Sequence, residues 1–454
     1  MYAGIVGSCR RAVRGGLSVA ALALVPGCSE GRSIAPAPDE VSLAVITRGA
    51  GCPPLDRSRV VFRCAPDPID APIPALVDPG DALAPYYERL AELARGRADH
   101  HVRIAMYGDS NLTTDETTGR LRRQLQGRFG DAGHGFVALA KPWRWYVHSD
   151  VAHDGTWRAF RQIATSTARV EDGHYGFANI AAESPSPGAL AFVSTTPSDA
   201  RSPIGWRAEH FDVFYMKRPT GGRFELQLDG RVVREVDTRA PRVEAGFERV
   251  DAPDGKHELR VRILGHGMVR LYGVAIERGD PSVVVDALGT GALNMQQMAT
   301  VQPDTRRAQL ARRAHDLVIL HLGTNMLGTK AELAAETKVV IGELRAALPG
   351  VAILILSPPD TFEEGTERDG HANAMAPLLG RVAAENGVAF WDFHAAMGGA
   401  GSIRAFVKKG LAWGDHIHLT KPGHERMADR MLCAMSDGMA AWLERNPGAG
   451  CGGP

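Results

Sequence analysis

Two short polar runs carry the residue types needed for serine nucleophilic catalysis. Ser110 ends the run Tyr107–Ser110, and the run Asp415–His418 supplies an acid and a histidine three positions apart. A serine hydroxyl is a weak nucleophile until a base takes its proton. We therefore expect His418 to be that base. We expect Asp415 to hold its imidazole in the required tautomer and to stabilise its cation.

Attack by a serine creates an oxyanion, which needs hydrogen-bond donors aimed at it. The backbone N–H of Ser110 fits, because it lies where a helix is expected to start and helix-start amides have no partner within the helix. Asn325, in the run Leu322–Asn325, offers a side-chain amide. Gly291 offers a backbone N–H without a side chain in the way, and Gly289 is the alternative glycine.

Neighbouring residues in these runs carry weaker signals. His416 and His418 form a His-x-His pair, but no acidic or cysteine partner stands at metal-ligand spacing, so we expect no metal site and no cofactor. Asp109 is expected to brace the turn before Ser110 by hydrogen bonding. Trp413 is compatible with either a place at the site or a place in the core.

Both runs lie in segments with an alternating strand and helix pattern. Strands are expected at 101–106, 283–285, 317–320, 351–356 and 388–391. Helices are expected at 83–95, 331–348, 373–385 and 422–443. Such a pattern is typical of an open α/β sheet, whose ligands bind beyond the carboxyl ends of the strands. The three predicted site segments are therefore expected to converge there.

The pattern changes between residues 141 and 282. Short alternating segments replace the helices, for example around Leu226 and Val261, and an Asp229-Gly230 pair indicates a hairpin. We expect an antiparallel β-sandwich inserted into a single α/β domain, whose two parts are residues 80–140 and 283–446. Residues 447–454 are expected to form a C-terminal tail.

The ordered set Ser110, Gly291, Asn325 and His418, with Asp415 three residues before the histidine, resembles the SGNH/GDSL hydrolase superfamily. The resemblance implies a flavodoxin-like three-layer α/β/α domain and ester hydrolysis by a Ser-His-Asp triad. Two positions depart from the common pattern. Asn111 follows the serine where leucine is commonest, and Met326 follows Asn325 where aspartate is common.

A narrower resemblance covers residues 108–137. The segments Gly119–Arg122 and Phe129–Phe136 look like the bacterial peptidoglycan O-acetylesterase branch, some members of which carry a carbohydrate-binding-like β-sandwich after the serine block. This implies an O-acetylated polysaccharide, above all peptidoglycan, as substrate. Three alternatives stay open: an O-acetyltransferase that uses the same triad, a non-catalytic glycan-binding lipoprotein, and a lipase or broad carboxylesterase.

The N-terminus predicts export. Arg10, Arg11 and Arg14 precede an apolar stretch that is too short to cross a bilayer as a helix, and the run Val25–Cys28 resembles a bacterial lipobox. We expect a signal peptide over residues 1–27 and lipid on Cys28, which would anchor the protein to a membrane of the cell envelope. Plain secretion and a buried first helix are the alternatives. Residues 28–79 are expected to be a tether and a Pro-rich segment.

Four cysteines would remain free to pair after export and lipidation, namely Cys52, Cys64, Cys433 and Cys451. An even number in an exported protein predicts two disulfides. Cys52–Cys64 and Cys433–Cys451 are favoured because each pair closes a short local loop. A zinc site is disfavoured because no Cys-x-x-Cys spacing occurs.

Composition limits the remaining possibilities. The 454 residues are 44% hydrophobic and 23% charged, which is ordinary for a globular protein and excludes a largely disordered one. Lys and Arg together equal Asp and Glu, at 52 each, so the net charge is zero. Without a basic excess to neutralise phosphates, nucleic acid is not an expected partner.

Overall fold

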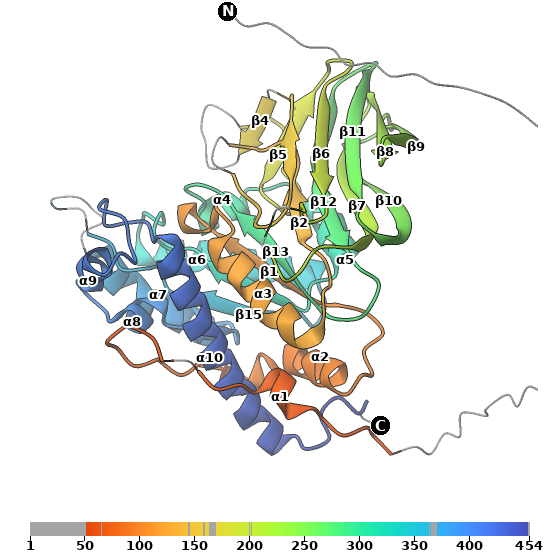
Figure 1. Cartoon of the computed structure of the whole chain (residues 1–454). Coiled ribbons are helices and arrows are strands. Elements are labelled where there is room, and N and C mark those ends of the chain that lie inside the picture. The colour runs from red at the N-terminus through yellow and green to blue at the C-terminus, as the bar shows by residue number, and fades with distance from the viewer. Residues whose placement is uncertain are drawn as a thin grey trace, which may run out of the picture. The chain divides into compact units, whose positions relative to one another are not determined.

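The computed structural model describes residues 51–452 apart from 65, 144–145, 158, 163–168, 199, 201, 363 and 365–369. The predicted signal peptide and Cys28 lie outside the described residues. Within them, an α/β domain and two antiparallel sheets make up the fold (Figure 1). No helix in the described part of the chain is long and apolar enough to span a membrane.

Five parallel strands form the central sheet of the α/β domain. Their order is β13-β1-β14-β15-β16, so the second strand along the chain precedes the first, and the third, fourth and fifth follow. This is the flavodoxin-like order, which confirms the predicted fold class. All five strands are largely buried, as expected for a sheet covered on both faces. The strands are β1 (Val102–Gly108), β13 (Val283–Gly289), β14 (Leu317–His321), β15 (Ala352–Leu356) and β16 (Ala389–Trp391).

Helices cover both faces of this sheet. One face packs against α2 (Ala84–Ala94), α3 (Glu116–Phe129), α8 (Phe393–Met397), α9 (Ser402–Lys408) and α10 (Lys421–Arg445). The other face packs against α4 (Met295–Ala299), α5 (Pro303–Arg313), α6 (Lys330–Ala347) and α7 (His371–Glu385). In Figure 1, α3 and α10 lie side by side; these are the helices that follow Ser110 and His418.

The sequence of α10 explains its length and its place in the core. Thr420 caps its start by accepting a hydrogen bond from the N–H of Gly423, and Pro422 stands in the first turn, where a missing N–H costs nothing. Methionines recur at four-residue spacing along one face and are all buried. They are Met427, Met431, Met435 and Met439.

Two antiparallel sheets form the sandwich. One has the order β10-β7-β12-β5-β4, with β2 paired to β12, and the other the order β3-β6-β11-β8-β9. Their facing side chains form one apolar cluster that includes Val213, Leu226 and Val261. The strands are β2 (Gly135–Ala138), β3 (His153–Gly155), β4 (Ala159–Gln162), β5 (Ile180–Ser184), β6 (Leu190–Ser194), β7 (Ala208–Lys217), β8 (Arg223–Leu228), β9 (Arg231–Asp237), β10 (Glu244–Gly255), β11 (Glu258–Gly265) and β12 (Val269–Glu277).

A buried ionic network joins the sandwich to the α/β sheet. Arg313 of α5 donates to Asp286 of β13 at 2.6 and 2.8 Å and also pairs with Glu277 of β12. Arg103 of β1 donates to the same glutamate at 2.9 and 2.8 Å. Burial raises the pKa of both carboxyls, but their cationic and hydrogen-bonding partners together outweigh it and hold each pKa well below its usual range: Arg313 and Arg103 for Glu277, and Arg313 and His315 for Asp286. Removing one partner would leave a buried charge without compensation, so this junction is expected to be rigid.

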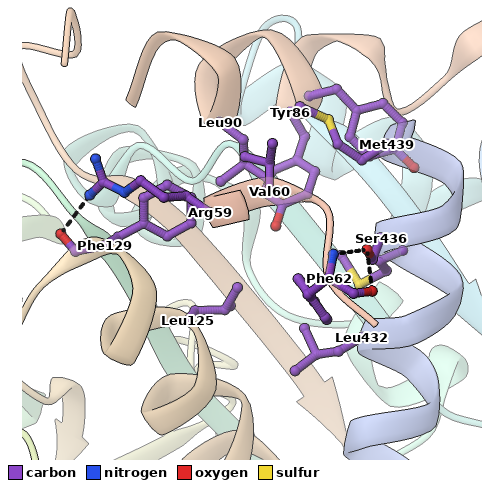
Figure 2. Close-up of a pocket in the computed structure, with 12 residues that line it drawn as sticks. Arg59, Val60, Phe62, Tyr86, Leu90, Leu125, Phe129, Leu432, Ser436 and Met439 are labelled. Atoms are coloured by element: carbon purple, nitrogen blue, oxygen red, sulfur yellow. Dashed lines mark hydrogen bonds between the residues drawn. The ribbon is translucent and has the colours of Figure 1, made fainter. Parts of the chain in front are cut away.

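The N-terminal strap, residues 52–64, contains the short helix α1 (Arg57–Val60) and lies over α2, α3 and α10. Figure 2 shows Arg59 directed at the carbonyl of Phe129, which it reaches at 3.3 Å, and Phe62 beside Ser436. The Phe62 N–H donates to Ser436 Oγ at 2.9 Å. Beneath the strap lies an apolar cavity of about 20 Å³, about the size of one water molecule.

Two disulfides fix the ends of this strap to the C-terminal part of the chain. Cys52 is bonded to Cys451, and Cys64 is bonded to Cys433 of α10. All four predicted cysteines are paired, but the favoured local pairing, Cys52–Cys64 with Cys433–Cys451, is wrong. The strap packs across α10, which brings each N-terminal cysteine next to a C-terminal one with the Cα atoms 5.5 Å apart. That spacing is normal for a disulfide.

Candidate active site

Ser110 stands at the end of β1, at the start of a single helical turn, Ser110–Leu112. Asp109 caps this turn by accepting a hydrogen bond from the N–H of Asn111 at 3.1 Å, the bracing predicted from the sequence. Thr113 Oγ1 donates back to the carbonyl of Ser110 at 2.8 Å. The turn is therefore held from both ends, which fixes the direction of the Ser110 hydroxyl.

His418 lies in a tight loop just before α10. Asp415 Oδ1 accepts hydrogen bonds from the N–H groups of Ile417 and His418, at 3.0 and 3.1 Å. The N–H of Trp413 donates to the carbonyl of His418 at 2.8 Å and closes the loop. Asp415 thus shapes the backbone that carries His418 as well as contacting its ring.

A continuous chain of hydrogen bonds links the three side chains predicted as a triad. His418 Nδ1 is 2.8 Å from Asp415 Oδ2, and His418 Nε2 is 2.9 Å from Ser110 Oγ. A carboxylate only accepts hydrogen bonds, so Nδ1 carries the ring proton and Nε2 is left to accept from the serine hydroxyl. This is the arrangement that base activation of a serine requires.

The acid of this chain stays ionised in mild acid. Partial burial raises the pKa of Asp415, but the hydrogen bonds from His418 and from the two backbone N–H groups outweigh it and bring the pKa below its usual value. The side chains of His418 and Asp415 are 38% and 45% exposed, so the site is open to solvent. A substrate can reach it without a lid opening.

The two remaining predicted site residues follow the strands on either side of β1. Gly291 comes just after β13, and Asn325 comes just after β14. The Asn294 side chain, in the loop that carries Gly291, donates to the Asn325 carbonyl at 3.0 Å and ties the two loops together. Sheet order therefore places Ser110 between them, at the switch point where ligands bind in such sheets.

Gly289 is closely packed, whereas Gly291 is not. A Cβ at Gly289 would lie 2.2 Å from the backbone oxygen of Leu112, while a Cβ at Gly291 would meet nothing within 4 Å. Gly289 also pairs with Gly108 at the end of the sheet. The geometry favours a packing role for Gly289, whereas the space beside Gly291 is open.

Asn111 has a role that sequence reasoning did not predict. Its side chain is 3% exposed and bonds to the His418 loop: Nδ2 donates to the carbonyl of Ile417 at 3.3 Å, and Oδ1 accepts from the N–H of Leu419 at 3.0 Å. The Asn111 side chain thus joins the loop of the nucleophile to the loop of the base. The only indication of this role in the sequence was that asparagine stands where leucine is commonest.

A cavity of about 470 Å³ opens beside the serine and the histidine. Trp413 lines it with 60% of the residue exposed, so it stands at the site and not in the core. The lining residues are Ser110, Asn111, Thr113, Thr114, Glu116, Trp413, Asp415, His418, Leu419, Lys421 and His424. Among the described residues no group of three or more His, Cys, Asp or Glu is arranged to hold a metal ion.

Part of the chain matches a known protein family. Residues 265–426, which include Gly291, Asn325, Asp415 and His418, match the sequence model of the GDSL-like Lipase/Acylhydrolase family. The α/β domain is an SGNH-type acylhydrolase domain. The protein is accordingly a carboxylic ester hydrolase, as predicted. The match does not extend to Ser110, so the acylhydrolase assignment rests on the later blocks and on the fold.

One solved structure shares the fold over most of this chain. A structure described as a peptidoglycan O-acetylesterase in action has a TM-score of 0.66 and 24% identity, covering 81% of this chain and 99% of its own. A family two carbohydrate esterase from Clostridium thermocellum has a TM-score of 0.26 and 11% identity, covering 59% of this chain and 95% of its own. The second likeness is too weak to carry an argument. No curated protein sequence matches the chain.

Proposed function

We propose that this protein is an exported serine esterase that removes O-acetyl groups from a polysaccharide, and that the polysaccharide is peptidoglycan. The observation that carries the mechanism is the chain from Asp415 through His418 to Ser110, with both hydrogen bonds below 3 Å. Ester hydrolysis by such a chain needs no metal or cofactor.

The reaction proceeds in two halves. Ser110 Oγ attacks the acetyl carbonyl while His418 Nε2 takes its proton, and the oxyanion is held by the N–H groups of Ser110 and Gly291 and the amide of Asn325. His418 then gives the proton to the sugar oxygen, which leaves as a hydroxyl. A water molecule, activated by the same histidine, attacks the acetyl-enzyme. Acetate leaves, and the proton returns to Ser110 Oγ.

Two observations support an acetylated polysaccharide as the substrate. The solved structure with a TM-score of 0.66 is described as a peptidoglycan O-acetylesterase and is matched over 99% of its length and 81% of this chain. The segments 119–122 and 129–136 also look like that branch of the superfamily. The sandwich would then either bind glycan or shape the cleft.

The test measures acetate release from O-acetylated peptidoglycan and from acetylated xylan. Wild type is compared with Ser110→Ala and with Ser186→Ala, a control on an exposed loop of the sandwich. We expect release from peptidoglycan that Ser110→Ala abolishes and Ser186→Ala preserves. Release from xylan alone would move the substrate, and transfer of acetyl to an added glycan acceptor would identify a transferase. Full activity in Ser110→Ala would refute the mechanism.

Export and anchoring form a separate part of the proposal. Two disulfides indicate an extracytoplasmic protein, because cytoplasmic thiols are kept reduced. Lipid on Cys28 rests on the lipobox-like run alone. Labelled fatty acid is expected to enter the wild-type protein and not Cys28→Ala. Absence of label from wild type, with the mature protein in the medium, would establish secretion instead.

A further inference from the structure

The cavity beside Ser110 lies on the side of the site where the alcohol half of an ester must sit. It is lined by Ser110, His418 and Trp413, and its lining includes neither Gly291 nor Asn325. In ester cleavage the histidine returns its proton to the leaving oxygen, so the leaving group must face His418. The acetyl oxygen faces the oxyanion donors, and the residues of two of them, Gly291 and Asn325, lie outside the lining of this cavity. The cavity therefore belongs to the leaving group.

The volume and lining of this cavity fit a ring that carries hydroxyls. About 470 Å³ lies within the range of roughly 300–1,000 Å³ typical of small-molecule sites, and far exceeds the needs of an acetyl group. The indole of Trp413 supplies a flat apolar wall and is 60% exposed. Thr114, Glu116 and Lys421 supply polar groups around it.

The charges in the cavity argue for a neutral ligand. Lys421 Nζ lies 3.4 Å from Glu116 Oε2, so the one cation among the lining residues already faces a carboxylate. Burial raises the pKa of Glu116, and the nearby Lys421 partly offsets this rise. An acid and an amine side by side offer an acceptor and donors, which suits hydroxyl groups better than a free anion.

We propose that this cavity is a pyranose subsite in which the sugar that carries the acetyl group stacks its C–H face on Trp413. Its hydroxyls meet Glu116 and Lys421 at the rim. This subsite rests on the proposed esterase function and specifies the alcohol that the enzyme releases. A pyranose has two apolar faces and a polar edge, so an aromatic wall with polar groups around it matches its shape and chemistry.

The test compares three acetate esters with different alcohols: a methyl glucoside with a single O-acetyl group, taken as its positional isomers, cyclohexyl acetate and ethyl acetate. Wild type is expected to prefer the glucoside ester. Trp413→Ala is expected to lower the ratio of kcat/KM for the glucoside ester to kcat/KM for ethyl acetate about tenfold. This corresponds to the loss of one aromatic contact. Trp413→Phe is expected to restore most of this ratio, because it keeps a flat ring.

Two controls separate stacking from general damage. Val232→Ala removes an exposed apolar side chain on β9, outside the cavity, and is expected to leave the ratio unchanged. Lys421→Met is expected to lower the preference for the glucoside ester over cyclohexyl acetate, since only the sugar has hydroxyls to bind. If Trp413→Ala leaves the ratio unchanged, whether kcat/KM stays the same or falls equally for all three esters, the subsite would be overturned. Hydrolysis of no ester by wild type would overturn the proposed function first.

Discussion

The side chain of Asn111 is hydrogen-bonded to the backbone on both sides of His418. It donates to the carbonyl of Ile417 and accepts from the N–H of Leu419. The residue next to the nucleophile therefore sets the position of the base, although the two are 307 positions apart in sequence. Any shift of one loop must be transmitted to the other through this buried amide.

Asn111→Leu is expected to lower kcat about 10- to 100-fold with little change in KM, because displacement of the base weakens proton transfer more than binding. The buried N–H of Leu419 also loses its partner, at about 1–3 kcal/mol in the free energy of unfolding, and the partly buried carbonyl of Ile417 loses one as well. Asn111→Asp keeps the acceptor for Leu419 and is expected to be the milder change. Steady-state kinetics and urea unfolding measure both effects, and a wild-type kcat in Asn111→Leu would refute the positioning role.

Asp415→Asn is expected to lower kcat about 10³- to 10⁴-fold while the loop persists. The amide oxygen still accepts the backbone N–H groups of Ile417 and His418, but its NH₂ group faces His418 Nδ1 and stabilises the wrong tautomer. Nε2 then carries the proton and cannot accept from Ser110. Burst and steady-state kinetics on a chromogenic acetate measure the loss.

The matched control is Asp437→Asn, on the exposed face of α10. It removes the same charge without touching the site, so its kcat is expected to match wild type. Equal small losses in both variants would show that Asp415 acts only through the net charge of the protein.

Removal of the disulfides is expected to be strongly non-additive. While Cys64–Cys433 stays closed, loss of Cys52–Cys451 frees a ring of only about 30 residues and costs about 3–4 kcal/mol of unfolding free energy. Loss of the second bond frees a loop of 369 residues and costs about 6 kcal/mol more. Urea unfolding of the Cys52→Ser/Cys451→Ser variant and of the four-serine variant measures the difference. Equal steps would contradict this loop-closure account.

Stability is expected to fall as the pH drops from about 6.5 towards 4. Burial lowers the pKa of His148 and His321 to about 3 and of His153 and His424 to about 4. In that window the unfolded chain binds protons that the folded chain does not, so each histidine costs about 1 kcal/mol per pH unit. Urea unfolding between pH 7 and 4.5 gives the slope.

His424→Gln is expected to reduce this slope by about one proton. The control is His266→Asn, because His266 is exposed and its φ of 65° is tolerated by asparagine. A slope that His424→Gln leaves unchanged would show that this residue is not kept neutral by the fold.

The sequence pattern predicted those parts of the fold in which buried positions carry apolar side chains. The buried strands of the sheet and the methionine face of α10 are apolar at the expected period, so they could be read from sequence. Helix α5 was missed because its buried face carries Arg306 and Arg313 beside Leu310, and its apolar stripe is therefore absent. Arg313 is buried only because Asp286 and Glu277 come from distant strands to meet it.

The same distinction applies to the site. The sequence allowed a proposal for the triad because its residue types, Ser110, Asp415 and His418, have the functional groups that the chemistry requires. Asp415 and His418 also lie close in sequence. The disulfide pairs and the bonds of Asn111 depend on which distant segments come together. Local sequence patterns do not show such long-range contacts. Trp413 was ambiguous because an indole suits both a core and an open cavity.

The pairing of the two disulfides determines when they can form, because each joins an early segment of the chain to a late one. Both cysteines of the N-terminal strap have partners near the far end of the chain. On the export route proposed above, Cys52 and Cys64 reach the oxidising side long before Cys433 and Cys451. They must stay unpaired, or be rescued from pairing with each other, until translocation is almost complete. The native crosslinks thus record that the whole polypeptide has arrived, and a truncated product cannot acquire them.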